Sequence, residues 1–302
     1  MSAQADVEAL LGRRGDPNGW LPLARAVTVV ENAPPWEVSF PEPERPAHVV
    51  GITGPPGAGK STLTGKLIET YADAGARVAV LAIDPSSPIS GGAVLGDRVR
   101  METALEGRSD VFVRSLASRG SHGALAASTR NVARLLEAWG TFDVVIVETV
   151  GAGQTEVAVA RLADTVVLVT VPGLGDAVQA IKAGLMEVAE MIVVNMADRP
   201  GTAETVRHLR LTIGRHVPVL QTIATDGTGV AELREALQGR WSEALETGTL
   251  AERRAAKEAA EAVLVAEAWV RACAGAADGA GSQPLRQAVK AILEEAARTW
   301  QR

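Results

Sequence analysis

The sequence predicts an α/β fold with a mostly parallel sheet, placed between helical extensions at the two ends of the chain. Short runs rich in Val, Ile and Leu alternate with segments of helical periodicity between residues 48 and 240. These runs are apolar almost throughout, which is typical of parallel strands covered on both faces. After residue 250 the pattern is helical only. The predicted strands are 48–53, 78–84, 111–116, 142–148, 165–171, 191–197 and 217–223.

Two changes in the pattern divide the chain into three predicted parts. Near the N-terminus, Leu23, Val27 and Val30 recur on one helical face. The stretch Pro41–Pro46 then breaks the helix and reads as a linker. We therefore predict an N-terminal helical extension with its linker (1–46), a phosphate-binding α/β domain (47–245) and a C-terminal helical arm (246–302).

The C-terminal arm carries a regular apolar stripe at helical spacing from Leu285 to Trp300, after a flexible connection at 274–283. Such a helical pair either packs on its own domain or hides its apolar surface in a dimer. The spacing leaves both possibilities open.

Composition excludes several classes of protein. The chain has 302 residues, a net charge of −6 and no basic run longer than two residues, which argues against nucleic acid as the main partner. No apolar run reaches the roughly 18 residues of a membrane span, and the N-terminus lacks a signal core, so we expect a cytoplasmic protein. A single cysteine, Cys273, and four scattered histidines offer no disulfide and no Cys/His metal cluster.

The most specific motif is Gly54–Ser61, which reads GPPGAGKS and matches the phosphate-binding loop G-x-x-x-x-G-K-[ST]. Glycines let the backbone N–H groups converge on a phosphate. Lys60 is expected to reach the β- and γ-phosphates and Ser61 to offer its hydroxyl to Mg²⁺. The predicted phosphate-binding residues are Gly54, Pro56, Gly57, Ala58, Gly59, Lys60, Ser61 and Thr62.

A second phosphate motif ends the strand predicted at 142–148. Glu148 and Gly151 form an E-x-x-G pattern, an acid for the metal followed by a glycine whose N–H can sense a γ-phosphate. Glutamate in place of the commoner aspartate lengthens the reach and favours binding through a water.

Between these motifs lies a Gly-rich segment, 84–98, with Asp84 at a strand end and Asp97 beside Arg98. Alone it is an ordinary loop, but next to a phosphate loop it is a candidate switch with metal-reaching acids. A further segment, 114–123, could present Arg119 to a nucleotide or a partner, and a plain helix N-cap explains its spacing equally well.

The choice of base depends on Asn195, Met196 and Asp198, which resemble the guanine motif N-K-x-D with Met in place of Lys. Asp198 keeps the charge that accepts bonds from guanine, and Met196 can cover the base apolarly. We expect guanine preference to survive with reduced affinity. The region of Ala224 could add a backbone N–H to guanine O6.

Taken together, the segments 54–62, 84–101, 114–125, 148–156 and 195–198 resemble the MeaB/ArgK/MMAA-type P-loop GTPases of the SIMIBI class. The resemblance implies a GTP- and Mg²⁺-binding chaperone that gates adenosylcobalamin loading and protects an acyl-CoA mutase of the methylmalonyl-CoA mutase type. It also implies a homodimer.

By motif, the residues that match the family's phosphate and magnesium sites are Lys60, Ser61, Asp84, Asp97 and Glu148, with Lys60, Asp97 and Glu148 as the catalytic set. Asp176 and Lys182 match the third switch loop, which couples the nucleotide state to the mutase.

Two related functions and one unrelated function compete with this interpretation. A nickel-type metal-insertion GTPase would need a His-rich or Cys/His tract, which this chain lacks. A kinase for a transport-binding protein would need ATP preference, against which Asp198 argues. A non-enzymatic module with a decayed pocket is disfavoured by intact Lys60 and Glu148. For the GTPase we expect slow intrinsic turnover that a partner raises.

Overall fold

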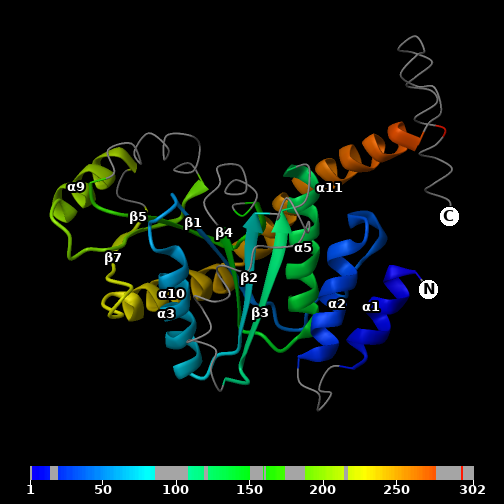
Figure 1. Cartoon of the computed structure of the whole chain (residues 1–302), viewed down its shortest axis with the longest axis horizontal. Helices are drawn as coiled ribbons and strands as arrows, with labels where there is room; N and C mark the ends of the chain where they lie inside the picture. The colour runs from blue at the N-terminus through cyan, green and yellow to red at the C-terminus, as the bar shows by residue number, and fades with distance from the viewer. Residues whose placement is uncertain are drawn as a thin grey trace, which may run out of the picture.

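The computed structural model describes residues 2–13, 20–85, 108–118, 122–149, 159, 161–173, 188–213, 217–276 and 294. Its centre is a seven-stranded sheet in the order β3-β2-β4-β1-β5-β6-β7, in which all paired strands are parallel (Figure 1). The predicted α/β fold with a parallel sheet is confirmed. The strands are β1 (His48–Thr53), β2 (Val78–Pro85), β3 (Val111–Ser118), β4 (Val144–Thr149), β5 (Thr165–Thr170), β6 (Met191–Val194) and β7 (Val219–Gln221).

Helices cover both faces of the sheet (Figure 1). On one face α3 packs against α10, and on the other α5 lies beside α2 and α11. The described helices are α1 (Ala3–Leu11), α2 (Leu21–Asn32), α3 (Lys60–Asp73), α5 (His122–Trp139), α9 (Thr202–Ile213), α10 (Val230–Glu246) and α11 (Thr249–Ala276), with a short 3₁₀ helix, η1, at Pro35–Glu37.

Strand alternation divides the core into two layers. Val49 and Val145 belong to the layer under α2 and α5, whereas Val50 and Ile146 belong to the layer under α3 and α10. Because successive strand residues point to opposite faces, the near-continuous Val/Ile runs of the sequence are what a sheet buried on both sides requires.

The N-terminal helices share the core under α5. Leu23, Val27 and Val30 of α2 are fully buried there, as their helical spacing predicts. Trp20 stacks on Phe142 with ring centroids 5.3 Å apart and meets Phe112 edge-on at 5.9 Å. The predicted division of the chain at residues 46 and 245 remains a prediction.

Several predicted boundaries differ from the structure, and the strand predicted over 217–223 is only Val219–Gln221. The strand predicted over 191–197 ends at Val194, because Met196 adopts a left-handed backbone with φ of 55° and turns the chain out of the sheet. At the other end, residues 274–276 are the last turn of α11 and not the start of a connection. The predicted apolar stripe from Leu285 to Trp300 falls, apart from residue 294, outside the described residues.

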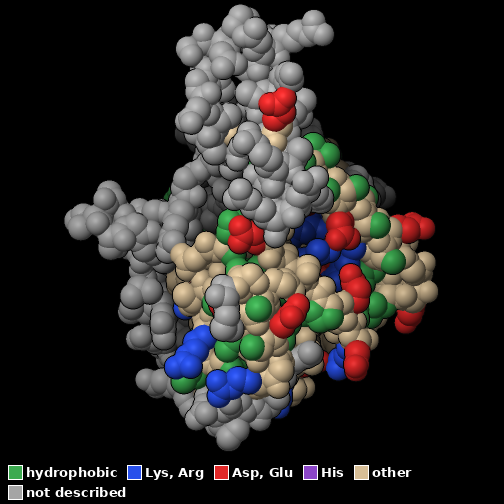
Figure 2. All heavy atoms as spheres, turned by 90° about the vertical axis from the view of Figure 1, so that its right-hand side faces the viewer, with side chains coloured by type: hydrophobic (Ala, Val, Ile, Leu, Met, Phe, Trp, Pro, Cys, Tyr) green, Lys and Arg blue, Asp and Glu red, His purple; other side chains and the backbone are tan. Residues whose placement is uncertain are grey.

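Two surface properties bear on the expected partners. Within the described part of the chain, no helix is both long and apolar enough to cross a membrane. On the face shown in Figure 2, the described basic side chains lie in small groups, some of them beside acidic ones.

Candidate nucleotide-binding site

The predicted phosphate loop joins the carboxyl end of β1 to the start of α3, at the middle of the sheet. β1 pairs with β4 on one side and β5 on the other, so chain crossovers leave this edge in opposite directions. Open α/β sheets bind ligands at such a point, beyond the carboxyl ends of the strands. The α3 N-terminus also directs unpaired backbone N–H groups toward the loop, which favours an anion.

Two glycines of the loop are required by close approach as well as by backbone angle. Gly54 has φ of 142°, and a Cβ there would lie 2.1 Å from the carbonyl oxygen of Val169. Gly59 has φ of 81°, and its Cβ would lie 2.4 Å from Nδ2 of Asn195. The loop can therefore press against β5 and β6 only with glycine at both positions.

Lys60 lies across this loop. Its side chain is 6% exposed, and Nζ donates to the carbonyl oxygens of Gly54 at 2.8 Å and Pro55 at 3.0 Å. The ammonium is thus held over the concave side of the backbone turn where the motif places phosphates.

Glu148 and Ser61 supply the oxygen atoms that a magnesium ion would need. Glu148 is the fifth residue of β4, beside Ile52 of β1, and is 1% exposed. Alternation along β4 places it on the α3 face, the same side as Ser61, which is 9% exposed. Carboxylate and hydroxyl oxygens are suitable ligands for Mg²⁺. For Asp84 the structure describes only the backbone, in β2.

Asn195 connects three parts of the site. Its Nδ2 donates to the carbonyl oxygen of Ala58 at 2.9 Å, and its Oδ1 accepts from Thr222 Oγ1 at 3.1 Å and from the backbone N–H of Ala224 at 3.0 Å. Asn195 is 2% exposed and Thr222 is fully buried. One buried amide therefore fixes the phosphate loop relative to the two loops that follow β6 and β7.

These loops enclose a pocket of about 170 Å³ beside the phosphate loop. Its wall includes Gly59, Thr62, Met196 and the exposed Asp198. The Met196 side chain approaches the loop closely, since its Cε lies 3.6 Å from the position of a Cβ on Gly59. A carboxylate and an apolar side chain thus line one cavity.

The structure adds one contact and one residue. The backbone N–H of Ala224 donates to Oδ1 of Asn195. Donation of a backbone N–H from the region of Ala224 to guanine O6 stays a prediction. Ala224 still lines the pocket, together with Ile223 and Thr225. Sequence reasoning missed Thr222, whose only signal was a hydroxyl residue near the end of the strand predicted over 217–223.

Several predicted residues cannot be placed relative to this site. Asp97, Gly151, Asp176, Lys182 and Arg119 lie outside the described residues.

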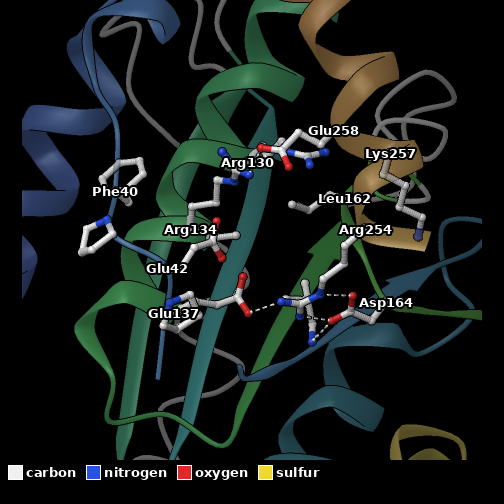
Figure 3. Close-up of a pocket in the computed structure, with 14 residues that line it drawn as sticks. Phe40, Glu42, Arg130, Arg134, Glu137, Leu162, Asp164, Arg254, Lys257 and Glu258 are labelled. Atoms are coloured by element: carbon white, nitrogen blue, oxygen red, sulfur yellow. Dashed lines mark hydrogen bonds and ion pairs between the residues drawn. The ribbon is translucent and has the colours of Figure 1, made fainter. Parts of the chain in front are cut away.

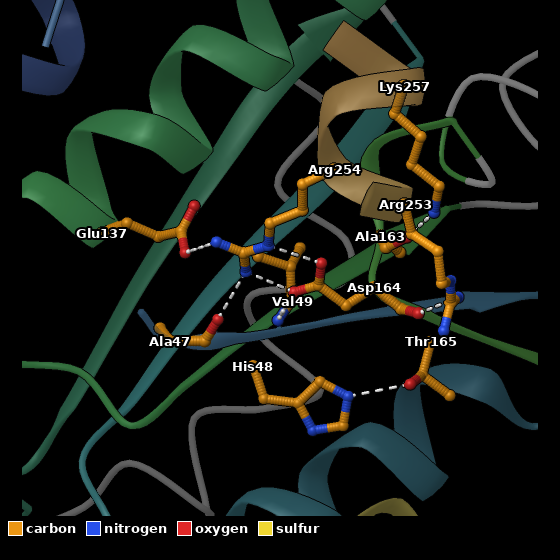
Figure 4. A network of polar contacts seen from close by, with 10 residues as sticks. All are labelled: Ala47, His48, Val49, Glu137, Ala163, Asp164, Thr165, Arg253, Arg254 and Lys257. Carbon is orange, nitrogen blue, oxygen red and sulfur yellow. Dashed lines mark hydrogen bonds and ion pairs between the residues drawn. The ribbon is translucent and has the colours of Figure 1, made fainter. Parts of the chain in front are cut away.

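The opposite, amino edge of the sheet is held by ion pairs around Arg254 of α11 (Figure 4). Its guanidinium contacts Asp164 through Nε at 2.8 Å and through a second nitrogen at 2.5 Å. It also donates to Glu137 at 2.9 Å and to the carbonyl oxygen of Ala47 at 2.9 Å. Burial alone lowers the pKa of Arg254, but hydrogen bonding and the charges of Asp164 and Glu137 raise it well above its ordinary value. α11 is thereby tied to the starts of β1 and β5 and to the end of α5.

His48 is buried next to this network. Its ring stacks on Trp241 at 4.7 Å with an interplanar angle of 9°, and Nε2 lies 2.9 Å from Thr165 Oγ1 (Figure 4). Burial lowers the pKa of His48 to about 4, so the imidazole is neutral at pH 7.

Comparison with known proteins identifies the family. The family model described as "Methylmalonyl Co-A mutase-associated GTPase MeaB" matches residues 23–278.

Individual relatives agree with this match. A Pyrococcus horikoshii protein named as a GTPase is 51% identical over 218 residues, which are 69% of this chain and 68% of that protein. GTPase ArgK of Escherichia coli is 40% identical over 65% of this chain and 59% of its own length. The mouse mitochondrial methylmalonic aciduria type A homolog is 36% identical over 68% of this chain and 52% of its own length. A crystal structure of a LAO/AO transport system kinase covers 96% of this chain and 91% of its own at a TM-score of 0.57 and 26% identity. The chain belongs to the MeaB family of P-loop GTPases.

Proposed function

We propose that this protein binds GTP with Mg²⁺ and hydrolyses it slowly, as a chaperone that gates adenosylcobalamin loading of an acyl-CoA mutase and protects the mutase. The family and its GTPase activity come from the comparisons. The base, the metal, the turnover and the partner are inferred from the site and from the family name.

The observation that carries the nucleotide assignment is the Asn195 junction. The Asn195 amide donates to the carbonyl oxygen of Ala58 in the phosphate loop, and Asn195 also lines the pocket that contains Asp198. The phosphate loop and the pocket are therefore held next to each other. A nucleoside triphosphate has the same two parts, a phosphate chain and a base, joined by a ribose. An acidic group at the base end supports guanine, whose N1–H and N2–H₂ both donate.

In this mechanism Lys60 stabilises the negative charge of the phosphates. In the structure its ammonium is bound to two carbonyl oxygens of its own loop, at 2.8 and 3.0 Å. Phosphate oxygens would replace or share these contacts, so a buried cation meets the charge that develops on the phosphoryl group during transfer. Because the cation is already in place, little reorganisation is needed when the nucleotide binds.

Ser61 and Glu148 would hold the magnesium ion, with Asp84 and Asp97 proposed as further contributors. Bound Mg²⁺ supplies charge neutralisation at the β- and γ-phosphates. The chain's own contribution is a carboxylate that is 1% exposed on the α3 side of the sheet, shielded from bulk water by neighbouring strands. Gly151 is proposed to sense the γ-phosphate, and Asp176 and Lys182 to transmit the nucleotide state to the mutase.

The decisive experiment measures hydrolysis of GTP and of ATP, each with and without an adenosylcobalamin-dependent methylmalonyl-CoA mutase. We expect GTP to be preferred, turnover to be slow alone, and the mutase to raise it. Preference for ATP would overturn the guanine assignment. Rapid turnover that the mutase leaves unchanged would overturn the role in timing while leaving the nucleotide site intact.

We further propose that α11 contributes to a homodimer. This helix extends beyond the body of the sheet (Figure 1), and Val263 is 58% exposed and Val270 37% exposed on it. Apolar side chains in such a position are covered at low cost by a second copy. Light scattering of the wild type and of Val263→Glu tests this: a dimer that the substitution weakens supports the proposal, and a monomeric wild type refutes it.

A further inference from the structure

The amino edge of the sheet contains a second pocket, far from the phosphate loop in the fold. It is about 110 Å³ in volume and lies between α5, α11 and the linker that precedes β1 (Figure 3). α5 contributes Arg130, Arg134 and Glu137, and α11 contributes Arg254 and Lys257. The nucleotide proposal uses none of these side chains.

Most charges around this pocket are neutralised by direct contacts. Arg254 pairs with both Asp164 and Glu137, and Arg134 pairs with Glu258. Each of these three acids therefore already has its cation. An acidic side chain that is paired in this way does not cancel the charge of a further arginine.

Arg130 is different. Among the described residues it forms no hydrogen bond and no ion pair, although it is partly buried and lines the pocket. Glu258 and Glu261 attract it only at longer range, while Arg134 repels it. Burial, followed by the charge of Arg134, lowers the pKa of Arg130. Lys257 also lines the pocket, and its Nζ donates to the carbonyl oxygen of Ala163; with the described acids it forms no ion pair.

The remaining wall is mostly apolar. Phe40 and Leu162 line the pocket, as do Pro41 and Pro43 of the linker, and the exposed Glu42 lies between these two prolines (Figure 3). A partly buried cation without a direct ion-pair partner is unfavourable, and an anion that enters the pocket would relieve it. The neighbouring apolar wall favours an anion with a hydrocarbon part over a fully hydrated inorganic one.

We propose that this pocket binds a small organic carboxylate, with its charge facing Arg130 and its hydrocarbon part facing Phe40 and Leu162. A planar guanidinium is suited to a carboxylate, with which it can form two parallel hydrogen bonds. The carboxylate comes either from a free small molecule or from the C-terminal end of a peptide chain. The inference does not depend on the proposed nucleotide function.

The test uses the full chain without nucleotide and propionate as the probe, followed by ligand-observed NMR. Propionate is expected to bind weakly, in keeping with its few atoms, and propionamide and inorganic phosphate at least tenfold more weakly. Arg130→Gln should raise the propionate Kd at least tenfold and Arg130→Lys less, whereas Arg207→Gln on the exposed face of α9 should leave it unchanged. Acetylated dialanine with a free or amidated end distinguishes the two sources: tighter binding of the free acid than of propionate assigns the site to a chain end, and the reverse assigns it to a small molecule.

Three results would overturn the proposal. Propionate and inorganic phosphate could bind equally, which would leave no role for the apolar wall. Binding could be unchanged in Arg130→Gln. Finally, Arg130→Gln could lower the melting temperature without altering binding, which would show that Arg130 serves the fold through Glu261. Thermal melts of each variant separate this last case from a loss of ligand.

Discussion

The two edges of the sheet hold their polar groups in different ways. At the carboxyl edge, neutral hydrogen bonds of Asn195 and Lys60 contacts to backbone carbonyls fix the loops. At the amino edge, Arg254 forms ion pairs with two acids from two different elements. At the carboxyl edge, a ligand can replace the backbone carbonyls that bind Lys60. At the amino edge, the charges of Arg254, Asp164 and Glu137 neutralise one another within the protein.

This contrast separates function from stability along one sheet. A site that must accept a nucleotide needs groups whose present partners are easily replaced, such as the carbonyls that bind Lys60. An edge that anchors a helix gains from partners that cannot be replaced without leaving a buried charge. Substitutions that break the Arg254 ion pairs at the amino edge should therefore change folding, and those at the carboxyl edge should change nucleotide binding.

The largest effect is expected from Arg254→Met. Asp164 and Glu137 would remain charged in a poorly solvated site, so the free energy of unfolding should fall by about 3–5 kcal/mol. Urea denaturation measures this, and Arg207→Met on exposed α9 serves as the control, with a change within about 0.5 kcal/mol. Unchanged stability would mean that the ion pairs are not what anchors α11.

Lys60→Ala should nearly abolish GTP hydrolysis while the fold persists. Losing a preorganised charge at the phosphoryl group typically reduces kcat by about 10²–10³-fold. The matched control is Lys66→Ala, six residues further along the same helix, which loses only a half-exposed ion pair with Glu69. Equal activity of the two variants in single-turnover assays would remove Lys60 from the mechanism.

Asn195→Ala should affect both properties, because it connects the loops. The carbonyl of Ala58, the hydroxyl of Thr222 and the N–H of Ala224 would all lose a partner, costing about 2–3 kcal/mol of stability. GDP affinity should fall as well, since the pocket is no longer held against the phosphate loop. Asn32→Ala at the exposed end of α2 is the control, and nucleotide affinity equal to that of wild type would contradict the proposed junction.

Met196→Lys should strengthen guanine-nucleotide binding by about tenfold, equivalent to about 1.4 kcal/mol. The substitution restores the residue of the usual guanine motif and keeps an unbranched chain at a left-handed backbone position. Met196→Leu, which adds no charge, should leave the GDP Kd within about twofold. Isothermal titration calorimetry measures the GDP Kd of each variant. A higher Kd for Met196→Lys than for wild type would show that the methionine itself favours nucleotide binding.

The smallest effect concerns pH. The pKa of His48 is about 4 in the folded protein, against an ordinary value of 6.5. Between these two pKa values the His48 imidazole is protonated in the unfolded chain and neutral in the folded protein. The contribution of neutral His48 to the free energy of unfolding is therefore fully present above pH 6.5 and is lost as pH falls toward 4. Between pH 6.5 and 5.5 the loss is about 1 kcal/mol. His48→Gln should abolish this component of the slope of unfolding free energy against pH, and an identical slope would refute the assignment.

Much of this architecture follows from local sequence pattern. All seven predicted strands are present, because Val/Ile-rich runs of six or seven residues between helices have few alternatives to a buried parallel sheet. Gly75 follows Ala74, the C-cap of α3, and has φ of 80°, the left-handed backbone that glycine commonly adopts just after a helix. The strand over 191–197 was predicted too long because nothing in its apolar composition marks the left-handed turn at Met196.

By itself, the sequence determined the sheet, the phosphate loop and the order of the motifs, because each depends on residues close together in the chain. Only the tertiary structure decided that Asn195 binds Ala58 and Ala224, and that Arg254 joins Asp164 to Glu137. These contacts span 29 to 137 residues of sequence. They depend on how the crossovers place distant segments at one sheet edge, which hydrophobic periodicity and residue spacing do not specify.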